Sequence, residues 1–194
     1  MTELNLNSIF WIAAPLALIA LVAVYFAYLY NRLFRYSNAA EANLGQIRVA
    51  LKKRLDMIEQ LLGAVRGYVR HEREVFESVA SMRARVMGAG AGGLTEIDRE
   101  SRGITGDILA IAEAYPDLKA NETVRKLMDA IVSVEDEIAR HRYTYNNIVQ
   151  TLNTMVDSIP SNVVAGIADV KKLDYLQFEE EIEERPEVTG IAES

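Results

Sequence analysis

The chain has 194 residues, no cysteine, two histidines and a formal net charge of -7 at pH 7. This acidic balance argues against a nucleic-acid partner, which usually needs a clustered basic face to displace phosphate counterions. The lack of cysteine excludes a disulfide framework, a thiolate nucleophile and a Cys-ligated metal, and two histidines leave little room for a His-rich metal site.

Residues 9–30 form an apolar run of about 22 residues that contains no charged side chain. At about 1.5 Å of rise per residue, a helix of this length crosses the hydrocarbon core of a membrane. The start of the chain does not resemble a cleaved signal peptide, because residues 1–8 contain no Lys or Arg. We therefore predict that residues 9–30 form a transmembrane helix that is kept as an anchor.

The flanks of this run predict its orientation and its interfaces. Arg32 and Arg35 follow the run directly, whereas no Lys or Arg precedes it. The positive-inside rule therefore places the short N-terminal segment outside and the C-terminal domain in the cytosol. Trp11 near one end, and Tyr28 and Tyr30 near the other, fit interfacial aromatic belts. We predict that these three aromatic side chains lie at the membrane interfaces, together with Arg32 and Arg35.

Downstream of the run, apolar residues recur every three or four positions from Leu33 to Val86, and no proline interrupts them. This spacing predicts one long amphipathic helix, with a bend near Gly63 and Gly67 if it bends at all. Residues 88–93 are predicted to be a flexible connector, because glycine loses the most backbone entropy on ordering. The connector lacks the Lys and Ser or Thr that complete a phosphate-binding loop.

A second helix is predicted to begin at Thr95. Thr95 and Asp98 resemble a capping box, in which the hydroxyl accepts a bond from a free backbone N–H and the carboxylate reaches back. Pro116 ends this helix, because the residue before a proline is pushed out of the α region.

Turn and cap residues separate the second helix from a long third one. The turn includes Asp117 and ends on Asn121, the predicted N-cap of the third helix. Pro160 stops this helix, and Asn162 directly after it is predicted to act as a cap. Asn146, in otherwise apolar surroundings, is predicted to satisfy polar groups between helices.

The last part of the chain changes in character. A shorter amphipathic piece is predicted around Val170, Leu173 and Phe178. Residues 179–194 are expected to be an acidic, disordered tail. Its glutamates are not predicted to be catalytic, because catalysis needs carboxylates held in differing environments and not a run of equal ones. No alternating β-branched pattern indicates a strand. The predicted fold is all-α, with an N-terminal transmembrane helix followed by an elongated antiparallel helical bundle over residues 31–178.

Six stretches in a fixed order carry a resemblance to a known family: YNRL at 30–33, IRVALKKRLDMI at 47–58, VRGYVRHE at 65–72, YPDLKANE at 115–122, YN at 145–146 and PSNVVAG at 160–166. Together they resemble the LemA family of bacterial membrane proteins. The resemblance implies a single N-terminal span, a helical bundle domain and the bacterial cytoplasmic membrane. It implies no enzyme, because the family has no established reaction. One relative in magnetosome-forming bacteria is associated with building membrane invaginations, which implies a role in membrane organisation.

The chain departs from the family pattern at two points. The family commonly has Trp where this chain has Leu44, and Pro-Asn where it has Glu59 and Gln60. A helix break near residue 59 therefore does not carry over.

No set of residues indicates catalysis. His71 and Glu72 begin like a zinc-protease motif, but Val75 stands where the second histidine would be needed. We predict no catalytic residue, no metal site and no cofactor.

One basic cluster is a candidate contact surface. Lys52, Lys53 and Arg54 are predicted contacts for a partner protein or for anionic lipid. The alternative is a solvated helix face, or pairing with an acidic neighbour such as Glu41, Asp56 or Glu59.

The leading functional hypothesis is a non-enzymatic, membrane-anchored scaffold that self-associates and organises membrane or partner proteins. Its motivation is the long apolar stripe, part of which a bundle of few, unequal helices leaves unpaired. The alternative is a regulatory adaptor of a membrane protease or transporter that acts through the bundle or the acidic tail. The predicted partners are membrane lipid, further copies of the chain in a homo-oligomer and a membrane protein, and no nucleic acid.

Overall fold

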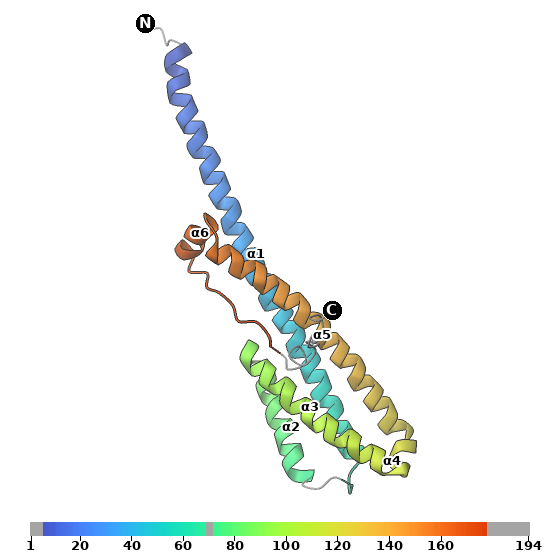
Figure 1. Ribbon diagram of the computed structural model, residues 1–194. Coiled ribbons are helices and arrows are strands. Elements are labelled where there is room, and N and C mark those ends of the chain that lie inside the picture. The colour runs from blue at the N-terminus through green and yellow to red at the C-terminus, as the bar shows by residue number, and fades with distance from the viewer. Residues whose placement is uncertain (1–5, 69–71, 178–194) are drawn as a thin grey trace, which may run out of the picture. The chain divides into compact units, whose positions relative to one another are not determined.

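The computed structural model describes residues 6–68 and 72–177 (Figure 1). Every regular element in this part of the chain is a helix, namely α1 (Leu6–Ala64), α2 (Glu72–Val86), α3 (Ala91–Ala114), α4 (Pro116–Ala120), α5 (Glu122–Asp157) and α6 (Ser161–Ile167). The all-α prediction is confirmed. The acidic tail at 179–194 lies outside the described residues, as does most of the segment at 1–8. The predicted domain boundaries therefore stay predictions.

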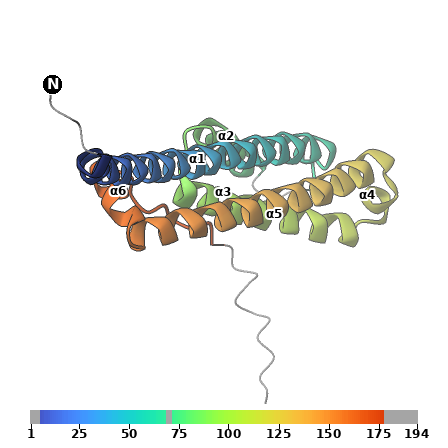
Figure 2. The ribbon, with the colours of Figure 1, turned by 90° about the horizontal axis from the view of Figure 1, so that it is seen from above.

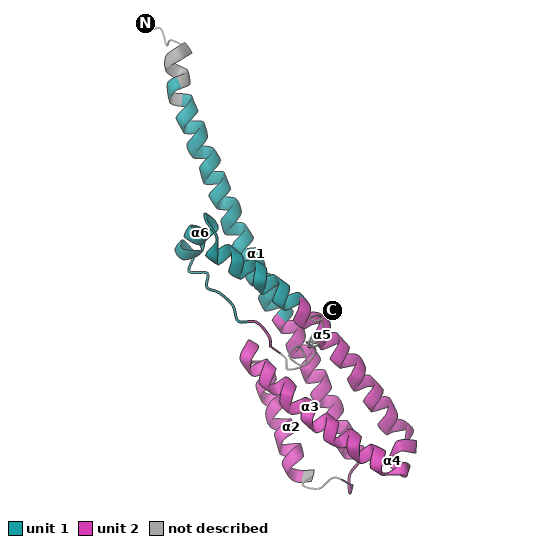
Figure 3. Ribbon diagram, in the orientation of Figure 1, with its two compact units in different colours: residues 1–43, 144–174 teal, residues 44–143, 175–194 magenta. Residues whose placement is uncertain are grey.

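The helices divide into two compact units, and both α1 and α5 contribute to each of them (Figure 3). Unit 1 comprises residues 1–43 and 144–174, and unit 2 comprises residues 44–143 and 175–194. Within each unit, a part of α5 runs back along a part of α1, so the two helices are antiparallel (Figures 1 and 2). The predicted antiparallel helical packing is confirmed.

The core of unit 2 is built on the apolar stripe of α1. Leu51, Leu55 and Ile58 share one face, because they are spaced three or four residues apart, and all three side chains are fully buried. The other helices of the unit contribute the buried residues Met82, Val86, Leu94, Ile108, Ile131 and Val134. The regular spacing of apolar residues along each helix is therefore what holds this bundle together.

The core of unit 1 lies where α6 and the C-terminal end of α5 pack against α1. Leu29 and Leu33, one helical turn apart on α1, are buried together with Leu152, Met155, Val164 and Ala165. The irregular segment after α6 is held on α5 by Asn153. The side-chain amide of Asn153 donates to Leu173 O (2.9 Å), and its Oδ1 accepts from Leu173 N (2.9 Å).

The predicted single helix from Leu33 to Val86 is wrong. α1 continues through residue 59 but ends at Ala64, and α2 begins at Glu72. Between them Gly67 has a φ of +92°, a left-handed conformation that glycine adopts without the steric penalty of a Cβ. At the position of the expected bend, the chain therefore leaves the helix, and a separate helix, α2, follows. The apolar spacing hides this break, because α2 continues the same pattern of threes and fours.

α3 begins earlier than predicted. It starts at Ala91, so Gly92 and Gly93 are helical and the connector is shorter than 88–93. The amide of Leu94 donates to Gly90 O (2.9 Å), and the Leu94 side chain is fully buried. Burial of this leucine outweighs the low helix propensity of the two glycines.

The predicted capping box is wrong as well. The hydroxyl of Thr95 donates to Ala91 O (3.1 Å) inside the helix instead of accepting a bond at its start. The Asp98 carboxylate does not reach back to Thr95 but lies 2.7 Å from the guanidinium of Arg54. The Thr95 contact is available because the helix extends upstream to Ala91, and the Asp98 contact is made with another helix.

The predicted helical piece around Val170 and Leu173 is also wrong. The last described helix is α6, which ends at Ile167, and the chain then leaves the helical conformation, with Asp169 at a φ of 50°. Phe178 lies outside the described residues.

Proline and asparagine mark the other helix ends correctly. α3 ends before Pro116, and α5 begins after Asn121 and ends before Pro160. The predicted turn between α3 and α5 folds as the short helix α4, with Pro116 in its first turn, where the missing N–H is not needed.

Candidate functional site

α1 carries a large exposed apolar surface near its N-terminal end. The side chains of Leu18, Leu21 and Val24 are 63%, 67% and 70% exposed. Of the described helices, this one alone is long and apolar enough to cross a membrane. Lipid would remove this surface from water, which is favourable. α1 is therefore consistent with a single-pass membrane anchor.

The aromatic residues predicted at the interfaces are accessible on α1. Trp11, Tyr28 and Tyr30 are all exposed. The ring of Tyr30 lies 4.7 Å from that of Phe34, one turn further along. Their contact with a membrane interface stays a prediction.

The two arginines after the apolar run differ in setting. Arg35 is exposed, whereas Arg32 is partly covered and its guanidinium lies 5.7 Å from the centre of the Tyr36 ring. A side-chain hydrogen bond with Tyr36 raises the pKa of Arg32. Arg32 is positively charged directly after the apolar run, because arginine does not lose its proton in proteins.

The basic cluster at 52–54 does not lie on one surface. Lys52 and Lys53 are exposed, and Lys53 Nζ lies 3.4 Å from Glu137 Oε2 of α5. Arg54 is fully buried, so the prediction that it contacts lipid or a partner is wrong. It falls on the apolar face of α1 because it lies three residues after the buried Leu51.

Arg54 is held by α3 and α5. Its Nη2 donates to Asp98 Oδ1 (2.7 Å), to Asp98 O (3.0 Å) and to Ser101 Oγ, and its Nη1 lies 3.8 Å from Glu135 Oε1. Asp98 and Ser101 are buried as well. The second carboxylate oxygen of Asp98 accepts from Arg102 Nε (2.9 Å). This network joins α1, α3 and α5 within unit 2.

Desolvation dominates the electrostatics of Arg54. Burial lowers the pKa of Arg54, although the charge of Asp98 acts in the opposite direction. The guanidinium nevertheless stays protonated, because arginine does not lose its proton in proteins. A buried charge of this kind depends on its partner, and loss of the partner leaves it uncompensated. The network therefore supports the fold of unit 2 and offers no accessible site.

The acidic neighbours of the cluster pair with α2. Arg83 Nε lies 2.7 Å from Asp56 Oδ1, and Arg83 Nη1 donates to Glu59 Oε2. The alternative in which Asp56 or Glu59 pairs with the basic cluster therefore gives way to an ion pair between α1 and α2.

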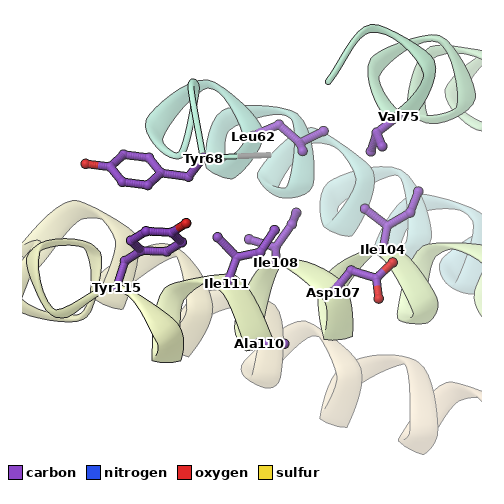
Figure 4. Close-up of a pocket in the computed structure, with 9 residues that line it drawn as sticks. All are labelled: Leu62, Tyr68, Val75, Ile104, Asp107, Ile108, Ala110, Ile111 and Tyr115. Atoms are coloured by element: carbon purple, nitrogen blue, oxygen red, sulfur yellow. The ribbon is translucent and has the colours of Figure 1, made fainter. Parts of the chain in front are cut away.

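A groove of about 430 Å³ lies in unit 2, beside the C-terminal end of α1 (Figure 4). Its walls come from three helices, through Leu62 of α1, Val75 of α2 and one face of α3. That face consists of Ile104, Ile108 and Ile111, which are spaced so that they point to the same side. The walls of the groove are therefore mostly apolar.

Polar groups mark the two ends of this groove. Tyr68 and Tyr115 lie together at one end, with ring centroids 4.9 Å apart in an edge arrangement, and Asp107 lies towards the other (Figure 4). An apolar hollow with a few polar groups is the usual form of a binding site. This arrangement suits a ligand segment that places an apolar side chain between the walls and a positively charged group next to the Asp107 carboxylate. Sequence reasoning missed it, because the two tyrosines come from turns that are far apart in the chain.

Two predicted turn residues lie at helix starts. Oδ1 of Asn121 accepts hydrogen bonds from the backbone N of Thr123 (2.9 Å) and of Val124 (3.3 Å), which caps α5. Asp117 is exposed in the first turn of α4, where a negative charge is favourable.

The other predicted structural residues lie in unit 1. Asn146 is half-buried on α5 and interacts with neighbouring groups. Pro160 directly precedes α6, which has no side-chain capping bond. The prediction that Asn162 caps is wrong, because its Oδ1 is buried without a hydrogen-bond partner among the described residues. Ser161 closes the turn instead, with its hydroxyl donating to Ser158 O (2.9 Å).

In the described part of the chain, no group of three or more His, Cys, Asp or Glu side chains is arranged to hold a metal ion. His71 lies outside the described residues. That the protein has no catalytic residue, metal or cofactor stays a prediction.

Comparison with known proteins identifies relatives that match most of the chain. Protein LemA of Metamycoplasma hominis is 26% identical over 160 residues, which cover 80% of this chain and 73% of that protein. Magnetosome protein MamQ 2 of Paramagnetospirillum magneticum is 23% identical over 175 residues, and Magnetosome protein MamQ of Magnetospirillum gryphiswaldense is 22% identical over 173 residues. These alignments cover 76% and 75% of this chain but 64% of each MamQ protein, which is less than two thirds of their length.

The profile of the LemA family matches residues 43–189, which is well over half of the chain. This range includes residues 44–143 of unit 2 and residues 144–174 of unit 1, which together hold all of α5 and α6. The chain belongs to the LemA family.

Proposed function

We propose that this protein is a non-enzymatic, membrane-anchored helical scaffold that self-associates and organises membrane or partner proteins. The observation that carries the proposal is the continuity of α1. This single helix of 59 residues begins as an exposed apolar surface and then contributes to the cores of both units. A scaffold needs such a link, because a force or contact on the helical part then acts directly on the anchor.

The orientation of the anchor is part of the proposal. Arg32 and Arg35 follow the apolar run, which supports a helical region on the cytosolic side of a bacterial cytoplasmic membrane. Protease added to intact cells that have only the outer membrane opened should leave residues 36–177 undigested. Digestion of that region before the cytoplasmic membrane is broken would contradict this orientation.

A stripe of small residues on α1 supports self-association within the membrane. Ala13, Ala17 and Ala20 are exposed and spaced so that they lie on one side of the helix. Small residues in this arrangement allow two membrane helices to approach closely. Ala20 and Leu29 are nine residues apart, which at about 3.6 residues per turn places them on opposite sides. The stripe therefore faces away from the core of unit 1 and leaves room for a second copy.

The test of self-association compares two variants with the same kind of substitution. Ala17→Leu combined with Ala20→Leu fills the stripe, whereas Ala14→Leu alters a side chain that points about 100° away from Ala13. Crosslinking in intact membranes, at native abundance, should give oligomers for the wild type and for Ala14→Leu, and fewer for the double variant. Recovery of monomer alone from the wild type would overturn the scaffold.

The MamQ relatives are named as magnetosome proteins. For this chain we propose only the organisation of a membrane or of proteins in it.

The groove in unit 2 favours a second candidate, a regulatory adaptor that presents the helical region to a membrane protease or transporter. Its apolar walls and the Asp107 carboxylate suit a segment of another protein. Deleting residues 179–194 tests whether the acidic tail or the groove is the docking element. Loss of the co-purifying protein on this deletion would assign docking to the tail. A co-purifying membrane protein that is lost on Ile104→Asp, while oligomers persist, would favour the adaptor over the scaffold.

A further inference from the structure

After Ser161 and Asn162 in its first turn, α6 carries only apolar side chains and one glycine. Val164 and Ala165 are buried in the core of unit 1. Val163 and Ile167, four residues apart and so on one face, are 51% and 80% exposed. Ile159, in the turn before α6, is 85% exposed. We call Ile159, Val163 and Ile167 the apolar corner.

A helix segment with apolar side chains on two sides is expected to be covered on both of them. One side of α6 is covered by the core of unit 1, so the apolar corner needs a second cover. Three neighbouring large aliphatic side chains form a patch, and exposed patches of this kind mark contact surfaces.

The core contacts place the apolar corner beside the end of the apolar run of α1 (Figures 1 and 3). α6 packs in one cluster with Leu29, within the predicted span, and Leu33, about 6 Å further along at 1.5 Å per residue. Tyr28 and Tyr30 are exposed at the same level of α1. When α1 crosses a membrane, α6 therefore lies where the hydrocarbon core meets the head groups.

We propose that the apolar corner inserts into the lipid bilayer beside α1 and gives the protein a second membrane contact. This inference rests on the membrane anchoring proposed above and adds a site to it. The bilayer is the occupant because it is present at this level of α1 whichever way the anchor is oriented.

The charged residues near the corner indicate how it binds. Lys171 Nζ lies 3.6 Å from Asp169 Oδ1, and Lys172 Nζ lies 2.7 Å from Asp157 Oδ2. Each of these two lysines has an acidic partner, so their charges are balanced locally, and the proposed contact of the corner rests on apolar insertion.

Insertion has a consequence for a scaffold. A single span leaves the attached unit free to rotate about the axis of the helix. A second contact beside the span fixes which side of unit 1 faces the membrane. Copies of the chain then approach each other with the same faces exposed.

The absence of native cysteine allows the test to be made with single labels in the full chain. Ile167→Cys and Val163→Cys report on the corner, Leu21→Cys reports on the span, and Asn147→Cys is an exposed control on α5 of the same unit. Each variant carries an environment-sensitive fluorophore in vesicles of zwitterionic lipid, with a second sample in which part of the lipid bears a nitroxide quencher.

We expect a blue shift of the emission, and its loss with quencher lipid, at residues 163, 167 and 21 but not at 147. Quenching at residue 21 with none at 163 and 167 would overturn the apolar corner and leave the anchor intact. No quenching at residue 21 would instead overturn the anchor itself.

A further measurement separates lipid from a second copy of the chain. In nanodiscs that hold one molecule each, quenching at residue 167 should persist. Its loss there would mean that the corner reaches lipid only when another copy is present, which would overturn the proposal. Ile159→Ser, at an already exposed position, should weaken quenching at Val163→Cys without unfolding the helices, as circular dichroism would report.

Discussion

The guanidinium of Arg54 and the carboxylate of Asp98 lie 2.7 Å apart, although 44 residues separate them in the chain. The exposed fractions of the two side chains are 0% and 2%. α1 and α3 are thus joined by an ion pair that water does not reach. Such a pair holds two helices in register, because separating the two charges would leave both of them buried without their main partner.

We predict that Asp98→Ala destabilises the protein by about 3–5 kcal/mol, because it leaves the Arg54 charge buried without its partner. Chemical denaturation of the full chain in detergent micelles, followed by circular dichroism, measures this change. Glu96→Ala, at an exposed position of the same helix, is the matched control and should change little. The double variant Arg54→Met, Asp98→Leu should regain most of the loss, since an apolar pair carries no desolvation penalty. Equal stability of Asp98→Ala and Glu96→Ala would contradict the role of the pair.

The two glycines at the end of α1 should respond in opposite directions. A Cβ at either Gly63 or Gly67 would meet no other atom within 4 Å, so only the backbone decides. Gly63→Ala, within the helix, should stabilise by about 0.5–1 kcal/mol. Gly67→Ala, at a φ of +92°, should destabilise by about 1–2 kcal/mol. Thermal unfolding of both variants measures the difference, and a gain in stability for Gly67→Ala would show that the turn has another geometry.

A comparison of Gly67 with Gly92 explains which helix boundaries can be predicted from the sequence. Pro116, Asn121 and Pro160 act on their immediate neighbours, so the helix ends that they set can be predicted. Glycine has no such fixed effect. Gly67 forms a turn, whereas Gly92 lies inside a helix, because tertiary burial of the following leucine decides the second case.

The same distinction applies to the sites. The prediction that Arg54 contacts lipid or a partner is wrong, although its position three residues after Leu51 on the apolar stripe is a signal for burial. Its partner Asp98 carries no such signal, since the capping pattern with Thr95 gives that residue a competing local role. The groove and the apolar corner depend on which turns and helices meet in space, and no local pattern contains that information.

Asn153 is expected to hold the irregular segment after α6 in place. Its side chain makes two hydrogen bonds with the backbone of Leu173, one as donor and one as acceptor. Asn153→Ala should cost about 1–3 kcal/mol, because it leaves both backbone groups without partners. Hydrogen exchange at the Leu173 amide should become faster. Asn147→Ala, an exposed asparagine of the same helix, should leave that exchange rate unchanged, and an equal effect of the two variants would rule out the specific tie.

Tyr68 and Tyr115 should be coupled in energy across the end of the groove. Their rings meet edge to face with centroids 4.9 Å apart, and the two residues belong to the turns on either side of the groove. A double-mutant cycle of Tyr68→Ala and Tyr115→Ala should give a coupling energy of about 0.5–1.5 kcal/mol, near the lower limit because both rings are partly exposed. Tyr143→Ala, at a tyrosine that is 71% exposed, provides a control cycle with Tyr68→Ala and should show no coupling. If the first cycle also gives none, the tyrosines do not close the groove, and its end is open to a partner.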